Sequence, residues 1–184
     1  MEENHIVPVL ESERLVLRPL MLDDLPALFK WAGDERVNRY MLYPLYKSEE
    51  DGREWISSLY KDDKKDFGFV LKATGELIGS GGIYPTDEPG VWSIGYNLRR
   101  DHWGQGLVPE AMQRIVSWAR ESLGLKVLEG SFAVGNDASR RVMEKLGMTF
   151  YKDSEFTKLD GSETFKAKTY RRVLTTGSET GRCI

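Results

Sequence analysis

The segment at residues 91–123 constrains the fold most, because it joins a strand, a glycine-containing turn and a helix without a linker. In the strand at 91–98, alternate side chains are apolar and share one face: Trp92, Ile94, Tyr96 and Leu98. The turn RRDHWGQG follows, and apolar residues then recur at helical spacing up to Leu123. Free backbone N–H groups and the helix dipole at such a helix start attract an anion. The segment therefore predicts either an anion site or a plain loop that begins a helix.

The rest of the chain contains further strands and helices, with no internal repeat. Alternating or short apolar runs predict six more strands, at residues 13–20, 66–72, 77–84, 126–134, 148–156 and 163–174. Helical spacing of apolar residues predicts three more helices, at residues 22–32, 48–61 and 136–146. We therefore expect a single α/β domain over residues 1–174, followed by a disordered tail at 175–184.

Length and charge limit the classes of function. A chain of 184 residues is long enough to bury one sizeable core. Its net charge of −3 disfavours non-specific binding of nucleic acid. No apolar run approaches the roughly 20 residues of a membrane span, and the acidic start MEENHIVPVLESER lacks the apolar core of a signal peptide. We therefore expect a cytoplasmic protein with neither a nucleic acid nor a membrane as partner.

Thiol and metal chemistry are disfavoured by the residue counts. Cys183 is the only cysteine and stands in a polar tail, so no internal disulfide is possible and no catalytic thiol is expected. The two histidines, His5 and His102, have no cysteine cluster beside them, so we expect no metal site.

The glycine turn does not match two common phosphate-binding motifs. There is no G-x-x-x-x-G-K-[ST], and Pro109 stands where the third glycine of G-x-G-x-x-G is required. This disfavours ATPases and nicotinamide-dependent dehydrogenases. Gly104 and Gly106 still allow the backbone to approach a ligand closely, and Arg99 and Arg100 add positive charge at the entrance.

Three segments, read together, carry a family resemblance: SERLVLRPLMLDDLPALFKW, IGYNLRRDHWGQGLVPEAM and NDASRRVMEKLGM. In this order, over about residues 11–174, the chain resembles the GNAT N-acetyltransferase superfamily. It is most similar to the branch that includes the ribosomal-protein N-terminal acetyltransferases. The resemblance implies a central mixed, mostly antiparallel sheet of six to seven strands, flanked by helices and splayed to hold acetyl-CoA. It also implies acetyl transfer from acetyl-CoA, the co-substrate, to an amine, and a homodimer.

The resemblance also implies which residues contact acetyl-CoA. In the family, backbone amides of the matching loop wrap the pyrophosphate, and here that loop is His102, Trp103, Gly104, Gln105, Gly106 and Leu107. The strand residues that pair with the pantetheine arm are Tyr96, Asn97 and Leu98. Many members carry Gln or Arg three residues before the first glycine, whereas this chain has Asp101. We expect Asp101 to point outward, with Arg99 or Arg100 supplying the compensating charge.

Acetyl transfer to an amine requires two proton movements. The amine is mostly protonated at neutral pH, so a proton must leave it before it attacks the thioester, directly or through water. The tetrahedral oxyanion needs an N–H donor, and the resemblance places it on the backbone near Tyr96 or Asn97. The departing CoA thiolate then benefits from a proton.

The candidate acid for the thiolate is a serine. Many family members use a tyrosine seven residues after the asparagine of the third segment, but here that position is Met143, which cannot donate a proton. The serine used by the ribosomal-protein branch corresponds to Ser139, and helical spacing places Ser139 at the N-terminal end of the buried stripe. The alternative is that Ser139 only satisfies backbone N–H groups of the first turn. Asn136 has two interpretations as well, as the helix N-cap or as a hydrogen-bond partner of the pantetheine.

The base and the acceptor groove are less closely specified. Glu155 and Glu129 are the candidate bases, with Glu155 favoured slightly, and the alternative for each is a solvated carboxylate with water taking the proton. Arg140 is a candidate for contact with the 3′-phosphate of CoA, or else part of a solvated helix face. Three tyrosines of an irregular, proline-containing segment are candidates for the acceptor groove: Tyr40, Tyr43 and Tyr46.

Three functions follow from these patterns. The leading one is acetylation of a protein N-terminal α-amino group. The second is acetylation of a small amine such as a polyamine, an aminoglycoside or an amino sugar, because a fold does not choose its substrate. The third is a non-catalytic CoA-binding regulatory module, which the missing tyrosine and the unassigned base allow.

Overall fold

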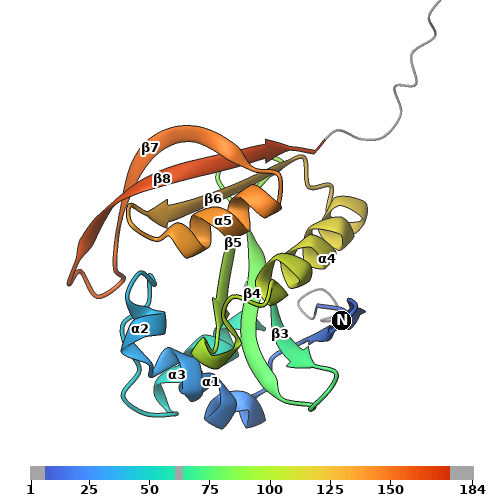
Figure 1. Ribbon diagram of the computed structural model, residues 1–184, viewed down its shortest axis with the longest axis vertical. Coiled ribbons are helices and arrows are strands. Elements are labelled where there is room, and N and C mark those ends of the chain that lie inside the picture. The colour runs from blue at the N-terminus through green and yellow to red at the C-terminus, as the bar shows by residue number, and fades with distance from the viewer. Residues whose placement is uncertain (1–6, 61–63, 175–184) are drawn as a thin grey trace, which may run out of the picture.

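The computed structural model describes residues 7–60 and 64–174, and one eight-stranded sheet organises them (Figure 1). The order across the sheet is β1-β2-β3-β4-β5-β6-β8-β7. The strand bounds are Leu10–Glu11 (β1), Leu15–Arg18 (β2), Lys65–Leu71 (β3), Leu77–Pro85 (β4), Val91–Leu98 (β5), Val127–Ala133 (β6), Thr149–Thr157 (β7) and Thr164–Val173 (β8). Neighbouring strands are antiparallel except β5 and β6, which run parallel. The prediction of a mixed, mostly antiparallel sheet is therefore confirmed.

Helices cover both faces of the sheet. Their bounds are Leu22–Asp24 (η1), Leu25–Ala32 (α1), Glu35–Asn38 (α2), Asp51–Leu59 (α3), Arg100–His102 (η2), Leu107–Ser122 (α4) and Asp137–Lys145 (α5). The larger core lies between the sheet and α4 with α5, where Ala111, Met112 and Ile115 have no exposed surface. A smaller core joins α1 and α3 to the opposite face, around Trp31 and Ile56. Each amphipathic helix thus buries its apolar stripe against the sheet.

The sheet opens between β5 and β6. These parallel strands pair at three positions only, the last of them Ser93 with Glu129. Beyond that point β5 continues to Leu98 and stays paired with β4, while β6 continues to Ala133 and stays paired with β8. The two facing edges therefore carry backbone groups without a strand partner, and the strands separate (Figure 1).

Helix α5 packs beneath this opening. A Cβ atom on Gly130 of β6 would lie 2.8 Å from Met143 Cε of α5 and 3.0 Å from Ile94 Cγ1 of β5. Met143 and Ile94 thus fill the space below the diverging strands, because position 130 lacks a side chain. The opening is held from one side by a packed apolar contact.

Two details differ from the sequence prediction. The sheet has eight strands instead of six to seven, because β1 contributes two residues, too few for an alternating pattern. Helix α2 was not predicted. It is a single turn, and the Asp34 side chain accepts a hydrogen bond from the Arg36 N–H at 2.9 Å at its start. The predicted tail at 175–184 lies outside the described residues.

Candidate active site

The glycine loop joins the end of β5 to the start of α4. Gly104 and Gly106 have φ values of 75° and 74°, in the left-handed region where side chains other than glycine are strained. Gly106 is the N-cap of α4 and no side chain caps this helix. Within the described residues, the backbone N–H groups of Leu107 and Val108 donate to no protein acceptor. They are therefore available to an anion at the helix start.

A clamp from the edge of the sheet holds this loop. Glu110, in the first turn of α4, accepts hydrogen bonds of 2.7 Å from the Ser12 hydroxyl, the Arg14 N–H and Arg14 Nε. Arg14 Nη1 also donates to the carbonyl oxygen of Gln105 at 3.0 Å. Burial raises the pKa of Glu110, but these hydrogen bonds outweigh it and hold that pKa below its usual value. The sequence analysis missed this clamp, since its partners are nearly 100 residues apart.

Asp101 is exposed and pairs with Arg99. The Arg99 Nε donates to Asp101 Oδ1 at 2.7 Å, and the Asp101 side chain is 60 % exposed. Arg99 Nη2 also lies 2.8 Å from His102 Nε2. Arg99 is therefore engaged by neighbours, whereas Arg100 is exposed. The charge of Asp101 is thus compensated by Arg99 and not by Arg100.

Ser139 and Tyr96 meet below the opening between β5 and β6. Their hydroxyl oxygens are 2.7 Å apart and share a hydrogen bond. Burial raises the pKa of Tyr96 above its usual value, so its hydroxyl keeps its proton. Asn136 Oδ1 accepts the Ser139 N–H at 3.2 Å and is the cap of α5. The Ser139 hydroxyl therefore does not serve as the cap.

On the other face of β5, the tyrosine segment contacts the same strand. The Tyr43 hydroxyl donates to Asn97 Oδ1 at 2.7 Å, and its ring lies 5.3 Å from that of Tyr46. Burial raises the pKa of Tyr43, which keeps this donor protonated. Tyr40 packs edge-on against Phe165 of β8 at 5.8 Å. Of the three predicted acceptor-side tyrosines, Tyr43 thus contacts a predicted acetyl-CoA residue, Tyr46 packs against Tyr43, and Tyr40 packs against β8.

The tip of the β7–β8 hairpin is fastened to this tyrosine segment. Lys158 Nζ donates to the Asn38 carbonyl at 3.1 Å and to its side-chain oxygen at 3.0 Å. The Leu159 N–H donates to the carbonyl oxygen of Leu42 at 2.8 Å. Asn38 is buried and also donates to the Tyr43 carbonyl. The hairpin and the segment after α2 therefore form one connected wall beside β5.

Comparisons with known proteins agree with this geometry. Residues 14–149 match the family model described as an acetyltransferase (GNAT) domain. The uncharacterized N-acetyltransferase p20 of Bacillus licheniformis is 31 % identical over 142 residues, which cover 74 % of this chain and 80 % of that protein. The chain belongs to the GNAT acetyltransferase family.

Two solved structures share the fold of this acetyltransferase. One is the microcin C7 self-immunity acetyltransferase MccE in complex with acetyl-CoA and AMP, with a TM-score of 0.77, 17 % identity, and coverage of 89 % of this chain and 94 % of that one. The other is the ribosomal-protein-S5-alanine acetyltransferase from Vibrio fischeri, with a TM-score of 0.73, 16 % identity, and coverage of 91 % and 97 %. The likeness extends over nearly the whole length of each chain.

The two predicted bases of the acetyltransferase are placed differently. Glu129 lies on the same face as Tyr43, but its carboxylate accepts a hydrogen bond from Arg171 Nε at 2.6 Å. Arg171 also donates to Glu88 at 2.7 Å. Glu129 is thus held in an ion pair.

Glu155 is not brought together with the other site residues. A bulge between Phe150 and Lys152 shifts the register of β7, so that Glu155 pairs with Lys166. Ser154 and Ala167 share the face of Phe165, toward Tyr40, and Glu155 therefore projects from the opposite face. We do not retain Glu155 as the base.

Arg140 is engaged along its own helix. Its guanidinium donates to Asp137 at 3.1 Å and to Glu144 at 2.8 Å. Both carboxylates raise the pKa of Arg140, with Glu144 contributing most. A phosphate at Arg140 has to compete with these two partners, which weakens the prediction of a contact with the 3′-phosphate.

The sequence analysis missed a buried acid beside the site. Asp66 of β3 is 5 % exposed, and the Tyr84 hydroxyl of β4 donates to its Oδ1 at 2.6 Å. No described residue bonds to Asp66 Oδ2. Burial raises the pKa of Asp66 to about 6, although the bond from Tyr84 and the charge of Lys64 oppose this. Only the register of β3 and β4 brings the acid and the phenol together.

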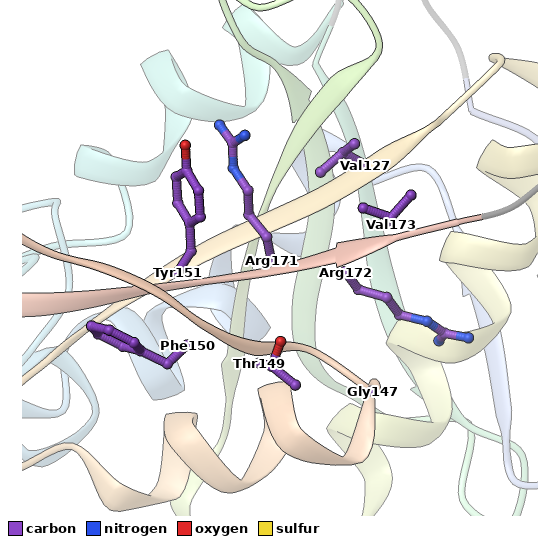
Figure 2. A pocket seen from close by; sticks show the side chains of 8 residues that line it. All are labelled: Val127, Gly147, Thr149, Phe150, Tyr151, Arg171, Arg172 and Val173. Atoms are coloured by element: carbon purple, nitrogen blue, oxygen red, sulfur yellow. The ribbon is translucent and has the colours of Figure 1, made fainter.

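A hollow of about 530 Å³ lies elsewhere (Figure 2). Its lining is Val127, Gly147, Thr149, Phe150, Tyr151, Arg171, Arg172 and Val173. Figure 2 shows Arg171 beside Tyr151, and the guanidinium carbon lies 4.2 Å from the ring centre. Val127 marks the end of β6 that is still paired with β5, so this hollow is remote from the glycine loop. We assign it no part in acetyl transfer.

Residues 7–60 and 64–174 contain no group of three or more His, Cys, Asp or Glu side chains placed to hold a metal ion. None of the helices among them is long and apolar enough to cross a membrane.

The pKa of Asp66 predicts a pH-dependent cost in stability. Between its unfolded pKa near 4 and its folded pKa of about 6, the folded state holds a proton that the unfolded state has lost. The contribution of Asp66 to the free energy of unfolding is therefore fully present below about pH 4 and is lost as the pH rises through 6. Asp66→Asn should gain about 2 kcal/mol relative to wild type between about pH 4.5 and 7.5. Urea unfolding of both proteins at the two pH values measures this difference.

Glu110→Gln is the control, because its effect on stability should change with pH in the opposite direction. The pKa of Glu110 is lowered, so its contribution is present above the unfolded pKa and lost as the pH falls. This variant should lose most stability relative to wild type at neutral pH. If the gap between Asp66→Asn and wild type does not change with pH, Asp66 has an ordinary pKa.

Proposed function

We propose that this acetyltransferase moves the acetyl group of acetyl-CoA to the α-amino group at a protein N-terminus, by direct attack through a tetrahedral intermediate. The observation that carries the proposal is the separation of β5 from β6 beside the uncapped start of α4. A long thioester with a pyrophosphate needs both features. The helix start receives the anionic end, and the free strand edge offers backbone groups to the amide-bearing arm.

The residues of this chain fit acetyl-CoA at that place. Nothing lies within 4 Å of the position that a Cβ on Gly104 would take, so the loop surface is open to a ligand. Acetyl-CoA supplies the activated acyl group. The backbone from Gly104 to Val108 holds the pyrophosphate, and the edge of β5 from Tyr96 to Leu98 aligns the arm. A backbone N–H near Tyr96 or Asn97 stabilises the oxyanion.

Ser139 is the proposed acid for the CoA thiolate. Its hydroxyl is hydrogen-bonded to Tyr96 on the α5 side of β5, and Asn136 already caps the helix. Ser139 can therefore give its proton to the sulfur as it regains one from Tyr96, and Tyr96 in turn regains one from water, without the loss of a helix cap.

The rim of the acceptor side favours a peptide over a small polar amine. Leu42 and Leu159 are joined by a backbone hydrogen bond and are 50 % and 78 % exposed. They stand on the wall formed by the hairpin and the tyrosine segment. Exposed apolar side chains at such a rim suit the side chains of a polypeptide, whereas a polyamine or an aminoglycoside offers charge and hydroxyl groups.

The test is a panel of acceptors mixed with acetyl-CoA, followed by free-thiol release and mass spectrometry. It contains peptides with free N-termini, the same peptides with acetylated N-termini and internal lysines, and small amines. We expect turnover of the free N-termini only. Turnover of small amines alone would shift the assignment to that class. Tight binding of CoA with no turnover would indicate a regulatory module.

Substitution of Gly104 tests the pyrophosphate contact. Gly104→Ala should weaken acetyl-CoA binding about tenfold, because a Cβ then occupies the open loop surface and strains a positive φ. Calorimetric titration with acetyl-CoA measures the affinity. Gly75→Ala is the matched control, since Gly75 has φ of 72° and equally open surroundings in the β3–β4 turn. If both variants bind acetyl-CoA like the wild type, the loop does not hold the pyrophosphate.

Substitution of Ser139 tests the acid. Ser139→Ala should lower kcat about 100-fold with little change in acetyl-CoA affinity, because the backbone cap by Asn136 stays in place. Steady-state kinetics with the best acceptor of the panel provide kcat. Ser154→Ala, which removes a hydroxyl bonded to Thr169, is the control and should leave kcat unchanged. An unaltered kcat in Ser139→Ala would remove this residue as the acid.

A further inference from the structure

We infer that Tyr84 and Asp66 form the base of the reaction: Tyr84 contacts the attacking amine, and Asp66 receives its proton. The inference rests on the proposed function and names the group that the sequence analysis sought in Glu129 and Glu155. It concerns the face of β5 that also carries Asn97 and Tyr43.

The register places the pair beside the opening in the sheet. Asp66, Gly82 and Gly95 stand in one row across β3, β4 and β5. Gly82 has no side chain, so the Tyr84 ring can lean across this row toward Asp66. A Cβ on Gly95 would lie 3.1 Å from Tyr84 Cε2 and 3.5 Å from its hydroxyl oxygen. The phenol therefore covers Gly95, two residues beyond the last pairing of β5 with β6.

The accessibility of the pair suits its two roles. Tyr84, Ser93, Gly95 and Asn97 are partly exposed, whereas Asp66 is buried behind the phenol. The Tyr84 hydroxyl lies against Gly95, so an amine bound over Gly95 at the edge of β5 reaches this hydroxyl before Asp66. Asp66 then acts through Tyr84, with one oxygen bonded to it and the other without a partner among the described residues.

The surroundings of Asp66 leave it able to take a proton. Among the described residues, Lys64 and Tyr60 line a small hollow together with Asp66, and Tyr60 donates its own hydroxyl to the Leu20 carbonyl. Burial outweighs the charge of Lys64 and raises the pKa of Asp66 to about 6. A base is most effective when its pKa lies near the working pH. At neutral pH the carboxylate is mostly ionised and is a stronger base than an exposed aspartate.

The proton transfer balances without any other reactant. One N–H bond of the ammonium breaks as its proton passes to the Tyr84 oxygen, and the Tyr84 proton passes to Asp66 Oδ1. The ammonium becomes a neutral amine, the phenol is unchanged, and the carboxylate becomes a carboxylic acid. The lone pair released on nitrogen is the one that attacks the thioester carbon. When the tetrahedral intermediate collapses, the C–S bond breaks, the nitrogen loses its second proton to water, and the sulfur gains one from Ser139. Asp66 loses the first proton to solvent after the acetylated product leaves.

The test compares Asp66→Asn and Tyr84→Phe with the wild type, using the acceptor peptide that the wild type acetylates best. Both variants should lower kcat/KM about 100-fold at pH 7 with acetyl-CoA affinity unchanged. The wild-type profile should level off above about pH 6. In Asp66→Asn it should rise about tenfold per pH unit up to the pKa of the α-amino group, near 8. Unchanged kcat/KM and an unchanged profile would overturn the inference and leave the proposed function standing.

A second measurement does not depend on turnover. A conjugate that links the CoA sulfur through an acetyl bridge to the α-nitrogen of a peptide places that nitrogen where the amine attacks. It should bind Tyr84→Phe about tenfold more weakly than wild type, while acetyl-CoA binds both alike. Equal affinity for the conjugate would overturn the inference. Failure of the wild type to acetylate any amine would instead overturn the proposed function.

Ser80→Ala is the matched control for loss of a buried polar atom. The Ser80 hydroxyl is 1 % exposed, lacks a described partner and stands one row from Asp66 on the same face. We expect less than a twofold change in kcat/KM. Thermal unfolding of all variants confirms that they fold. A loss in Ser80→Ala equal to that in Asp66→Asn would assign the effect to packing and overturn the inference.

Discussion

The early end of pairing between β5 and β6 is the constraint on which the site depends. Parallel strands normally stay bonded along their length, and unpaired backbone groups are costly when buried. Here the separation is held from below, where Met143 and Ile94 pack over Gly130 and Tyr96 bonds to Ser139. It is held at the end by the glycine loop, which Arg14 and Glu110 tie to the sheet edge. The strands cannot close without the loss of these contacts.

The long helices and strands, and the glycines at their ends, could be predicted from the sequence, because both depend on the local spacing of residues. The α4 stripe and the positive-φ glycines of its loop are of this kind. Short elements such as β1 and α2 have too few residues to show a period. The face of Glu155 could not be read either. One extra residue at Tyr151 inverts the alternation of β7, and without it Glu155 would share the face of Phe165.

Side-chain pairs that are brought together by strand register could not be predicted from the sequence, because their members are far apart along the chain. Asp66 sits near the start of a strand, where an acidic residue usually marks a solvated end, and its partner is 18 positions away. Arg14 and Glu110 are 96 positions apart. Each of these two pairs required the geometry of two elements at once. The cap of α5 is different, because it is local: the sequence offered Asn136 as the N-cap or as a pantetheine partner, and the structure shows it as the N-cap.

The arrangement separates the two proton movements of the proposed reaction. Successive residues of β5 point to opposite faces, so Tyr96 meets Ser139 on the α5 side, while Gly95 lies beneath the phenol of Tyr84. In this proposal the sulfur gains its proton on one face and the amine loses its own on the other. If the proposed acid, Ser139, and the proposed base, Asp66, lay on one face of the sheet, the base could take the proton that the thiolate needs. Strand β5 lies between them and keeps them apart. Gly95 leaves room for the Tyr84 phenol on the face that the amine would approach.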